Sequence, residues 1–238
     1  MSVFDRIKQM AEKNKGNFDR EEAIRQVEER RLAAEDEQYD RFKKQFDECS
    51  ARESIGRSGI LPLHQHCRVN NFEATTAEQA HARDFALQYI TNFHLNNGGG
   101  FIFSGNPGTG KNHLAAAICN ELMNRNKSCM VITVTELMQK LRNCYNSGSE
   151  TTEDQFIRSM IDFDLLILDE IGLQRNSDAE KLALNQIVDQ RICRMKPTGM
   201  LTNLDQRTIN DCLGVRIMDR MRSNGGKWIS FNWNSYRK

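Results

Sequence analysis

The stretch Gly105–Asn112, which reads GNPGTGKN, constrains the fold of this chain more than any other. It has the G-x-x-x-x-G-K spacing of a phosphate-binding loop, in which backbone N–H groups surround phosphate oxygens and Lys111 adds a positive charge. An apolar run at residues 101–104 precedes it, and a segment rich in helix formers, residues 113–123, follows it. The order strand, loop, helix favours a phosphate-binding loop over a glycine-rich turn that meets a lysine by chance.

The bulk composition excludes several classes of protein. A formal net charge of +1 over 238 residues argues against a wholly basic protein that coats nucleic acid, although it leaves room for a local basic path. Seven cysteines, an odd number without a CxxC pair, favour reduced thiols in the cytosol. No apolar run approaches the roughly 20 residues of a membrane helix, and no signal-peptide core is present. We therefore expect a cytoplasmic protein without a membrane partner.

Composition divides the chain into three parts. Residues 1–58 mix charges of both signs with short apolar stripes, such as Phe4, Ile7 and Met10, and we expect a helical arm that docks on a partner protein. A partly disordered charged arm is the alternative. Residues 59–74 contain glycine and proline and are expected to be a linker. Residues 75–238 are expected to form the main domain.

The linker contains three potential metal ligands, His64, His66 and Cys67. Structural zinc sites take spaced pairs of ligands from two segments, and no second pair occurs in the sequence. Exposed linker side chains are therefore favoured over a metal site.

Alternating strand and helix patterns predict an α/β fold with a parallel sheet flanked by helices. Besides residues 101–104, strands are expected at 128–134, 163–170, 196–203 and 227–233. Helices are expected at 75–94, 135–142, 153–160, 179–194 and 213–222, with Thr76 and Thr135 as N-caps of the first two. Few residues follow the last strand, so we expect no C-terminal lid domain.

Polar residues follow two of the predicted strands. Asp169 and Glu170 end an apolar strand, at the edge where open α/β sheets bind ligands. Asp169 is a candidate magnesium ligand, and Glu170 a candidate general base for the attacking water. Asn203 ends a later strand, where it either orients this water or caps the next helix; the sequence leaves both open.

Four more residues are candidates with an alternative each. Arg216 and Arg220 lie four apart on one helix face, and they either pair with local carboxylates or reach a nucleotide of a neighbouring subunit. Tyr145, in a polar loop, is a candidate for stacking on a base of single-stranded DNA, or is an ordinary surface or core tyrosine. Ser177 is a weaker candidate for a contact to DNA, or is a loop or helix-cap serine.

With these motifs in this order, the chain resembles the DnaC-type replicative helicase loaders of bacteria and their phages, within the AAA+ ATPases. The resemblance extends from about Arg57 to Arg237, whereas the arm agrees only in position and charged helical character. The most specific matches are five segments: 103–120, 169–172, 197–203, 216–221 and 231–233.

The resemblance implies an AAA+ core that binds ATP or ADP with Mg²⁺ and hydrolyses ATP weakly. It implies that Asn112 and Asp169 hold the metal, that Asn203 is the first sensor and that Arg237 is the second. Arg220 would be the arginine finger that acts on the next subunit, with Arg216 beside it. The remaining residues implied to hold the nucleotide are Gly105, Asn106, Pro107, Gly108, Thr109, Gly110, Lys111 and His113.

Two residues have a special place in this comparison. The family carries Asn at the position of Asn112, and an amide oxygen is a neutral magnesium ligand, so we expect metal binding to be retained. Val215 stands where the family usually has Glu, which removes a possible partner for a nearby arginine.

The resemblance also implies partners. The arm would grip a hexameric DnaB-type helicase, and the core would bind single-stranded DNA and self-associate into a spiral. An ATP-binding accessory protein of a transposition system, which shares this core, is one alternative. A helicase-inhibiting adaptor without hydrolysis is another, against which the intact Asp169, Glu170 and Arg220 argue.

Overall fold

The computed structural model describes residues 25–26, 58–145, 151–172 and 177–237. The apolar stripes predicted in the arm lie outside these residues.

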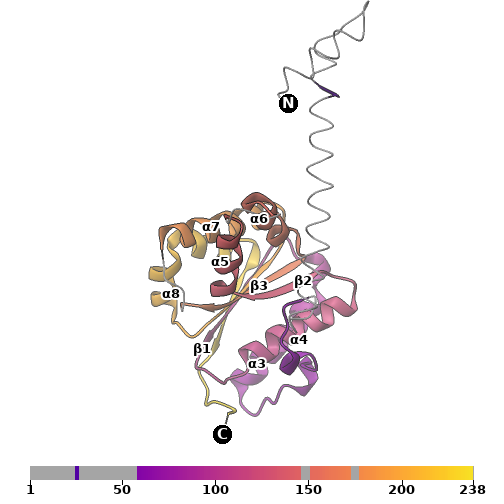
Figure 1. The fold of residues 1–238 in the computed structure, drawn as a ribbon. Helices are drawn as coiled ribbons and strands as arrows, with labels where there is room; N and C mark the ends of the chain where they lie inside the picture. The colour runs from indigo at the N-terminus through magenta and orange to yellow at the C-terminus, as the bar shows by residue number, and fades with distance from the viewer. Residues whose placement is uncertain (1–24, 27–57, 146–150, 173–176, 238) are drawn as a thin grey trace, which may run out of the picture. The chain divides into compact units, whose positions relative to one another are not determined.

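A parallel five-stranded sheet forms the centre of the domain, which confirms the predicted α/β class (Figure 1). The strand order is β2-β3-β4-β1-β5, and every neighbouring pair is parallel. The strands are β1 (Phe101–Gly105), β2 (Cys129–Thr133), β3 (Leu165–Ile171), β4 (Thr198–Thr202) and β5 (Lys227–Phe231). Because the strands are parallel, their carboxyl ends all lie at one edge of the sheet.

Helices cover both faces of this sheet. Figure 1 shows α3 and α4 on one side and α5, α6 and α7 on the other. Their bounds are α3 (Ala77–Thr91), α4 (Lys111–Asn124), α5 (Val134–Asn143), α6 (Glu153–Asp162) and α7 (Asp178–Cys193), followed by α8 (Gln206–Leu213) and α9 (Val215–Arg222). Short 3₁₀ helices lie at Pro62–His64, Val69–Asn71, Phe93–Leu95 and Ser223–Gly225. Among the described helices, none has the length and apolar character that a membrane span requires.

Capping side chains decide where several helices begin. Thr76 caps α3 as predicted, in a reciprocal capping box with Gln79. The prediction that Thr135 caps the next helix is wrong, because the Thr133 hydroxyl accepts the Glu136 N–H at 3.1 Å and α5 begins at Val134. The sequence reading also missed α8, which Gly214, with a φ of +86°, separates from α9.

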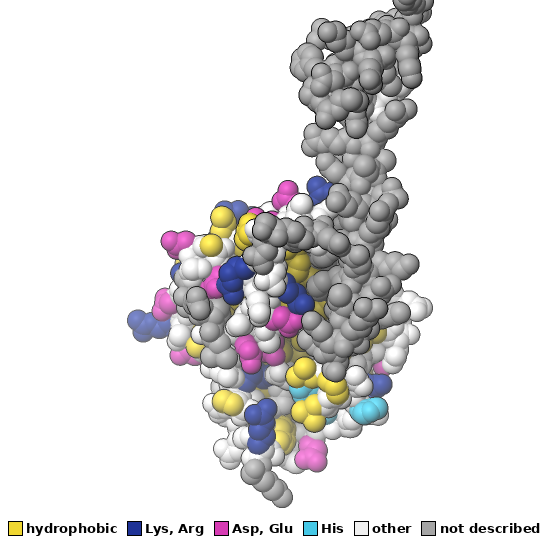
Figure 2. All heavy atoms as spheres, in the orientation of Figure 1, with side chains coloured by type: hydrophobic (Ala, Val, Ile, Leu, Met, Phe, Trp, Pro, Cys, Tyr) yellow, Lys and Arg dark blue, Asp and Glu magenta, His cyan; other side chains and the backbone are white. Residues whose placement is uncertain are grey.

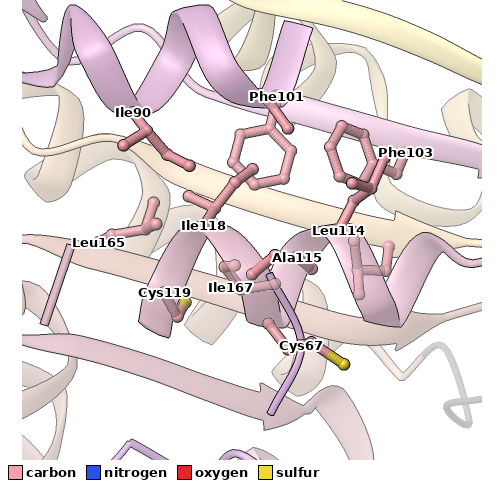
Figure 3. Packing of buried hydrophobic residues seen from close by; sticks show 14 of the residues in the cluster. Cys67, Ile90, Phe101, Phe103, Leu114, Ala115, Ile118, Cys119, Leu165 and Ile167 are labelled. Atoms are coloured by element: carbon pink, nitrogen blue, oxygen red, sulfur yellow. The ribbon is translucent and has the colours of Figure 1, made fainter. Parts of the chain in front are cut away.

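Side chains on both faces of the sheet are buried in the core. Phe101 and Phe103 of β1 pack with Ile90 of α3 and with Leu114 and Ile118 of α4 (Figure 3). Successive strand residues point to opposite faces of the sheet. Ile102 of β1 and Leu166 of β3, which point to the other face, are buried as well. Burial on both faces explains why the strands read as uninterrupted apolar runs.

The segment 59–74, expected as a linker, packs on the α4 face of the core. Phe72 and Cys67 are buried in the same cluster as the α4 residues, so the prediction of an exposed Cys67 is wrong. The buried Asn120 amide of α4 donates hydrogen bonds of 3.0–3.3 Å to the carbonyls of His64, Gln65 and Cys67. A single polar side chain inside the core thus fixes the path of this segment.

Arg191 of α7 is a buried cation on the opposite face. Its guanidinium is fully inaccessible to solvent. It donates to the Thr198 hydroxyl and to the carbonyls of Met160, Ile161, Phe163 and Pro197 at 2.6–3.1 Å. One side chain therefore donates hydrogen bonds to backbone carbonyls of buried residues both at the carboxyl end of α6 and just before β4.

We expect Arg191→Met to lower the free energy of unfolding by about 3 kcal/mol or more, because several carbonyls of buried residues each lose a hydrogen bond from a charged donor. Urea unfolding followed by circular dichroism measures this change. The control is Arg158→Met on α6, an exposed arginine, which should change the free energy by less than about 0.5 kcal/mol. Equal losses in the two variants would contradict the role given to Arg191.

Candidate active site

Four separate segments meet at the carboxyl edge of the sheet. A cavity of 230 Å³ there is lined by residues of the β1–α4 loop, the ends of β3 and β4, and the last described residue. Among the lining residues are Lys111, Asn112, Asp169, Glu170, Asn203 and Arg237. The structure therefore brings together residues that the sequence placed up to 126 positions apart, at the edge where α/β sheets bind ligands.

Glycines allow the loop after β1 to pass close to its neighbours. Gly105 has a φ of +141°, and a Cβ there would lie 2.2 Å from the Phe231 carbonyl oxygen of β5. Gly110 has a φ of +88° and is the residue from which α4 begins. The loop thus ends at a helix N-terminus, whose free N–H groups favour an anion.

Lys111 is held inside this loop. Its Nζ donates to the carbonyls of Gly105 and Asn106 at 2.8 and 2.7 Å. Burial lowers the pKa of Lys111 to about 8, Asp169 acts in the opposite direction, and Arg237 adds to the lowering. An anion in the cavity would favour the charged form of Lys111, so the electrostatics of the loop suit a phosphate.

Asn112 contacts the end of β3 directly. Its Nδ2 donates to Oδ2 of Asp169 at 2.7 Å. Only the amide nitrogen can donate to a carboxylate, which leaves the amide oxygen as an acceptor or a metal ligand. Most phosphate-binding loops carry a Ser or Thr directly after the lysine, and its hydroxyl can both donate and bind a metal. Asn112 can supply the same pair of functions.

The oxygens at Asn112 and Asp169 suit a magnesium ion. Burial raises the pKa of Asp169, although hydrogen bonds from the Glu170 N–H and from Asn112 oppose this shift. A half-buried carboxylate beside a neutral amide oxygen is a fitting pair for a hard cation, whose charge would offset the cost of burial.

A β-bulge shapes the end of β3. Leu168 pairs with Met200, and the next pair is Ile171 with Thr202, so β3 carries one extra residue between them. Within the bulge Glu170 takes a φ of +57°, a region that side chains other than glycine rarely occupy, and its N–H donates to Oδ1 of Asp169 at 2.6 Å. The bulge turns the two carboxylates away from regular strand positions toward the cavity.

Asn203 lies exposed at the end of β4 and lines the same cavity as Glu170. The alternative that Asn203 caps the next helix is wrong. Asp205 is that cap, because its carboxylate accepts the Thr208 N–H at 2.8 Å. Asn203 is thereby left free to face a ligand.

Residues 232–237, which we call the strap, run along the loop. Trp233 donates its indole N–H to the Thr109 carbonyl at 3.1 Å, and the Tyr236 N–H donates to the Gly108 carbonyl at 2.9 Å. Sequence reasoning assigned no role to Trp233 or Tyr236. The signal available was two aromatic side chains in a polar stretch immediately after a strand.

A larger cavity of 730 Å³ lies between the loop, the strap and the segment 59–74. Phe72, His113 and Tyr236 line it, and the volume is in the range of ligand pockets, about 300–1,000 Å³. His113, predicted to hold the nucleotide, also fixes the wall, since its Nε2 lies 2.8 Å from Oδ1 of Asn71.

Arg216 and Arg220 both pair with a carboxylate of their own chain. Both bind Asp189 of α7, with Arg216 Nη2 at 2.5 Å from Oδ2 and Arg220 Nε at 2.9 Å from Oδ1. Neither arginine lines the two cavities beside Lys111. The structure therefore does not bring them to the phosphate loop of their own chain.

Tyr145 and Ser177 lie away from these cavities. The Tyr145 side chain is exposed, and a hydrogen bond with Glu153 raises its pKa to about 12. Ser177 caps α7, since its hydroxyl accepts the Glu180 N–H at 3.3 Å, which is the alternative to a contact with DNA. Over the face shown in Figure 2, basic and acidic side chains are interspersed among the described residues.

Comparison with known proteins places this site in a family. Residues 24–238 match the family model described as IstB-like ATP binding protein. The replicative helicase loader DnaC of Escherichia coli is 49% identical over 185 residues, which cover 77% of this chain and 74% of that protein. The chain belongs to the IstB-like ATP-binding family and, within it, to the DnaC helicase loaders. The DnaC of Buchnera aphidicola subsp. Acyrthosiphon pisum is 37% identical over 238 residues, 99% of this chain and 94% of that protein.

Solved structures agree on the fold. A DnaC helicase loader superposes with a TM-score of 0.63 at 20% identity over 71% of this chain and 98% of that one. DnaI superposes with a TM-score of 0.62 at 23% identity over 74% and 93%. At these identities the likeness supports the parallel α/β fold and no particular residue role.

We expect Glu170→Gly to be more stable than Glu170→Ala by about 1 kcal/mol, because only glycine takes the left-handed backbone without strain. The matched alanine variant removes the same carboxylate and keeps the strain. Parallel urea unfolding of the two proteins measures the difference. A glycine variant that is less stable than the alanine variant would show that the backbone at Glu170 is not strained.

Proposed function

We propose that this protein is an ATP-dependent loader that binds a DnaB-type replicative helicase and helps to place it on single-stranded DNA at the initiation of replication. The 49% identity to a replicative helicase loader is the observation that carries this proposal. The geometry supports the ATP-dependent part, since an anion-binding loop, a carboxylate pair and an exposed amide surround one cavity.

Each side chain around the cavity has a chemical task. Lys111 and the loop N–H groups would hold the outer phosphates of ATP. Mg²⁺, held by Asn112 and Asp169, would neutralise charge on the same phosphates. The Glu170 carboxylate would accept the proton of the attacking water, and the Asn203 amide would orient that water.

The remaining charge on the γ-phosphate would be met by Arg220 of a neighbouring subunit, with Arg216 beside it. Both arginines lie on α9, outside the cavity of their own chain, which supports a role in trans. The γ-phosphate would then connect two subunits, and its hydrolysis would release the assembly. Arg237, which lines the cavity from the strap, would sense the nucleotide in its own subunit.

Partner contacts are assigned to other parts of the chain. The charged arm, residues 1–58, would grip the helicase, and the exposed Tyr145 ring would stack on a base of the single strand. The Ser177 hydroxyl is a weaker candidate, because it already caps α7.

Two alternatives compete with this proposal. An accessory ATPase of a transposition system would need a transposase in place of the helicase, and the DnaC relatives favour the loader. A non-hydrolysing inhibitor would not need Glu170, Asn203 and Lys111 around a common cavity, as they are here.

We expect the full-length protein with ATP to retain a DnaB-type helicase in a pull-down and to place it on closed circular single-stranded DNA. Lys111→Ala should retain little ATP and lose the placement, since the phosphate loop loses its charge. Asp84→Asn on the exposed side of α3 serves as a control that leaves both steps intact. Retention of the helicase with blocked unwinding and no ATP turnover would favour the inhibitor instead.

Subunit mixing tests the arginine in trans. Lys111→Ala subunits can donate arginines but hold no ATP, whereas Arg220→Ala subunits hold ATP but donate no finger. Each variant alone should be inactive, and an equal mixture with single-stranded DNA should regain roughly a quarter of wild-type turnover, because about one interface in four combines an intact site with an intact finger. Normal turnover of Arg220→Ala alone would show that Arg220 is not the finger.

A further inference from the structure

Asp189 of α7 is shared by the two arginines of α9. Its two carboxylate oxygens accept from different arginines, Oδ2 from Arg216 Nη2 and Oδ1 from Arg220 Nε. The helices α7 and α9 pack against each other, so the carboxylate is fixed to the core and reaches the surface helix. This arrangement is a three-residue cluster that the sequence patterns did not indicate.

The cluster solves an electrostatic problem. Two guanidinium groups four residues apart on one helix face repel each other, and both carry a full charge at any physiological pH. A carboxylate between them offsets this repulsion and holds both side chains in one place. The Asp189 side chain is 19% exposed, whereas that of Arg216 is 71% exposed. The carboxylate is therefore largely buried, and the Arg216 guanidinium that it holds lies at the surface.

The atoms used are also informative. Arg220 binds Asp189 through Nε, and within the part of the chain that the structure describes its two terminal nitrogens make no hydrogen bond. A phosphate prefers the paired donors of a guanidinium group. Binding through Nε therefore leaves Arg220 oriented and still able to offer two donors to an anion.

We propose that Asp189 is a positioning residue that orients Arg220 and Arg216 toward the phosphates of ATP held by the next subunit. This rests on the proposed loader function, in which Arg220 acts in trans. Asp189 touches no phosphate itself. Its contribution is to hold the Arg220 side chain in few orientations beforehand, so that less conformational entropy is lost when the transition state forms.

The test uses Asp189→Asn, which keeps the size of the side chain and removes its charge. In the full-length protein with single-stranded DNA, kcat for ATP should fall about tenfold, because two charge-assisted hydrogen bonds are weakened. The KM for ATP should stay unchanged, since the variant leaves the cavity around Lys111 intact. Asp189→Glu, which keeps the charge, should retain more turnover than the asparagine variant. Asp211→Asn on α8, an exposed carboxylate, is the control with the same change in net charge.

Mixed assemblies show on which side of the subunit interface Asp189 acts. Asp189→Asn is added either to the Lys111→Ala subunits, which donate only arginines, or to the Arg220→Ala subunits, which supply only ATP sites. Turnover of the mixture should fall about tenfold when the Lys111→Ala subunits carry the substitution, and it should stay unchanged when the Arg220→Ala subunits carry it.

Each other outcome contradicts the proposal. Equal loss in both placements would mean general damage to the fold, and full turnover in the first placement would mean that Arg220 needs no such anchor. An inactive mixture of the two parent variants would overturn the finger in trans, and with it the role of Asp189. These results separate failure of Asp189 from failure of the proposed function.

Discussion

The hydrogen bond of 2.7 Å between the Asn112 amide and the Asp169 carboxylate connects the two halves of the candidate site. Asn112 lies in the first turn of α4 after β1, whereas Asp169 lies near the end of β3, and β4 lies between β1 and β3 in the sheet. The bulge that adds one residue to β3 lies between Leu168 and Ile171, so Asp169 and Glu170 both belong to it. The proposed magnesium ligand Asp169 and the proposed base Glu170, with its left-handed backbone, thus lie in one local distortion.

The larger cavity beside the phosphate-binding loop, a candidate nucleotide pocket, has walls from distant parts of the domain. The segment 59–74 closes one side, and the strap closes another through its bonds to Gly108 and Thr109. The two walls also contact each other, since the Tyr236 hydroxyl donates to the Glu73 carbonyl at 2.6 Å. The carbonyl of Ser58, the last residue of the predicted arm, accepts the N–H of Val131 on β2. A nucleotide in this cavity would therefore touch the segment that leads back to the arm.

In the proposed function, the ion pairs of the α9 arginines with Asp189 matter more for orienting the arginines than for stability. Pairs as exposed as Arg216 with Asp189 contribute only about 0–1 kcal/mol to folding. Their consequence is orientation, because a fixed guanidinium loses less entropy when it meets a phosphate. Arg191, in contrast, is fully buried and closes the backbone of α6 and β4, so its place in the same α7 helix is structural.

The sequence alone determined the features that depend on local spacing. Apolar runs of strand length, the glycine loop with Lys111 and the helix cap at Thr76 follow from periodicity and from residue chemistry within a few positions, and they were predicted correctly as elements. The placement of Asp169 and Asn203 near the loop also followed, because parallel strands end at one edge.

Only the tertiary structure decided what depends on partners far along the chain. The burial of Cys67 requires Asn120, the bulge at Glu170 requires the register of β3 on β4, and the pairing of Asp189 with Arg216 and Arg220 requires α7 to pack on α9. The choice of Asp205 over Asn203 as helix cap depended on where β4 ends and α8 begins. Hydrogen bonds across 27 to 57 positions leave no periodic signal in a sequence, because packing rather than local spacing brings their atoms together.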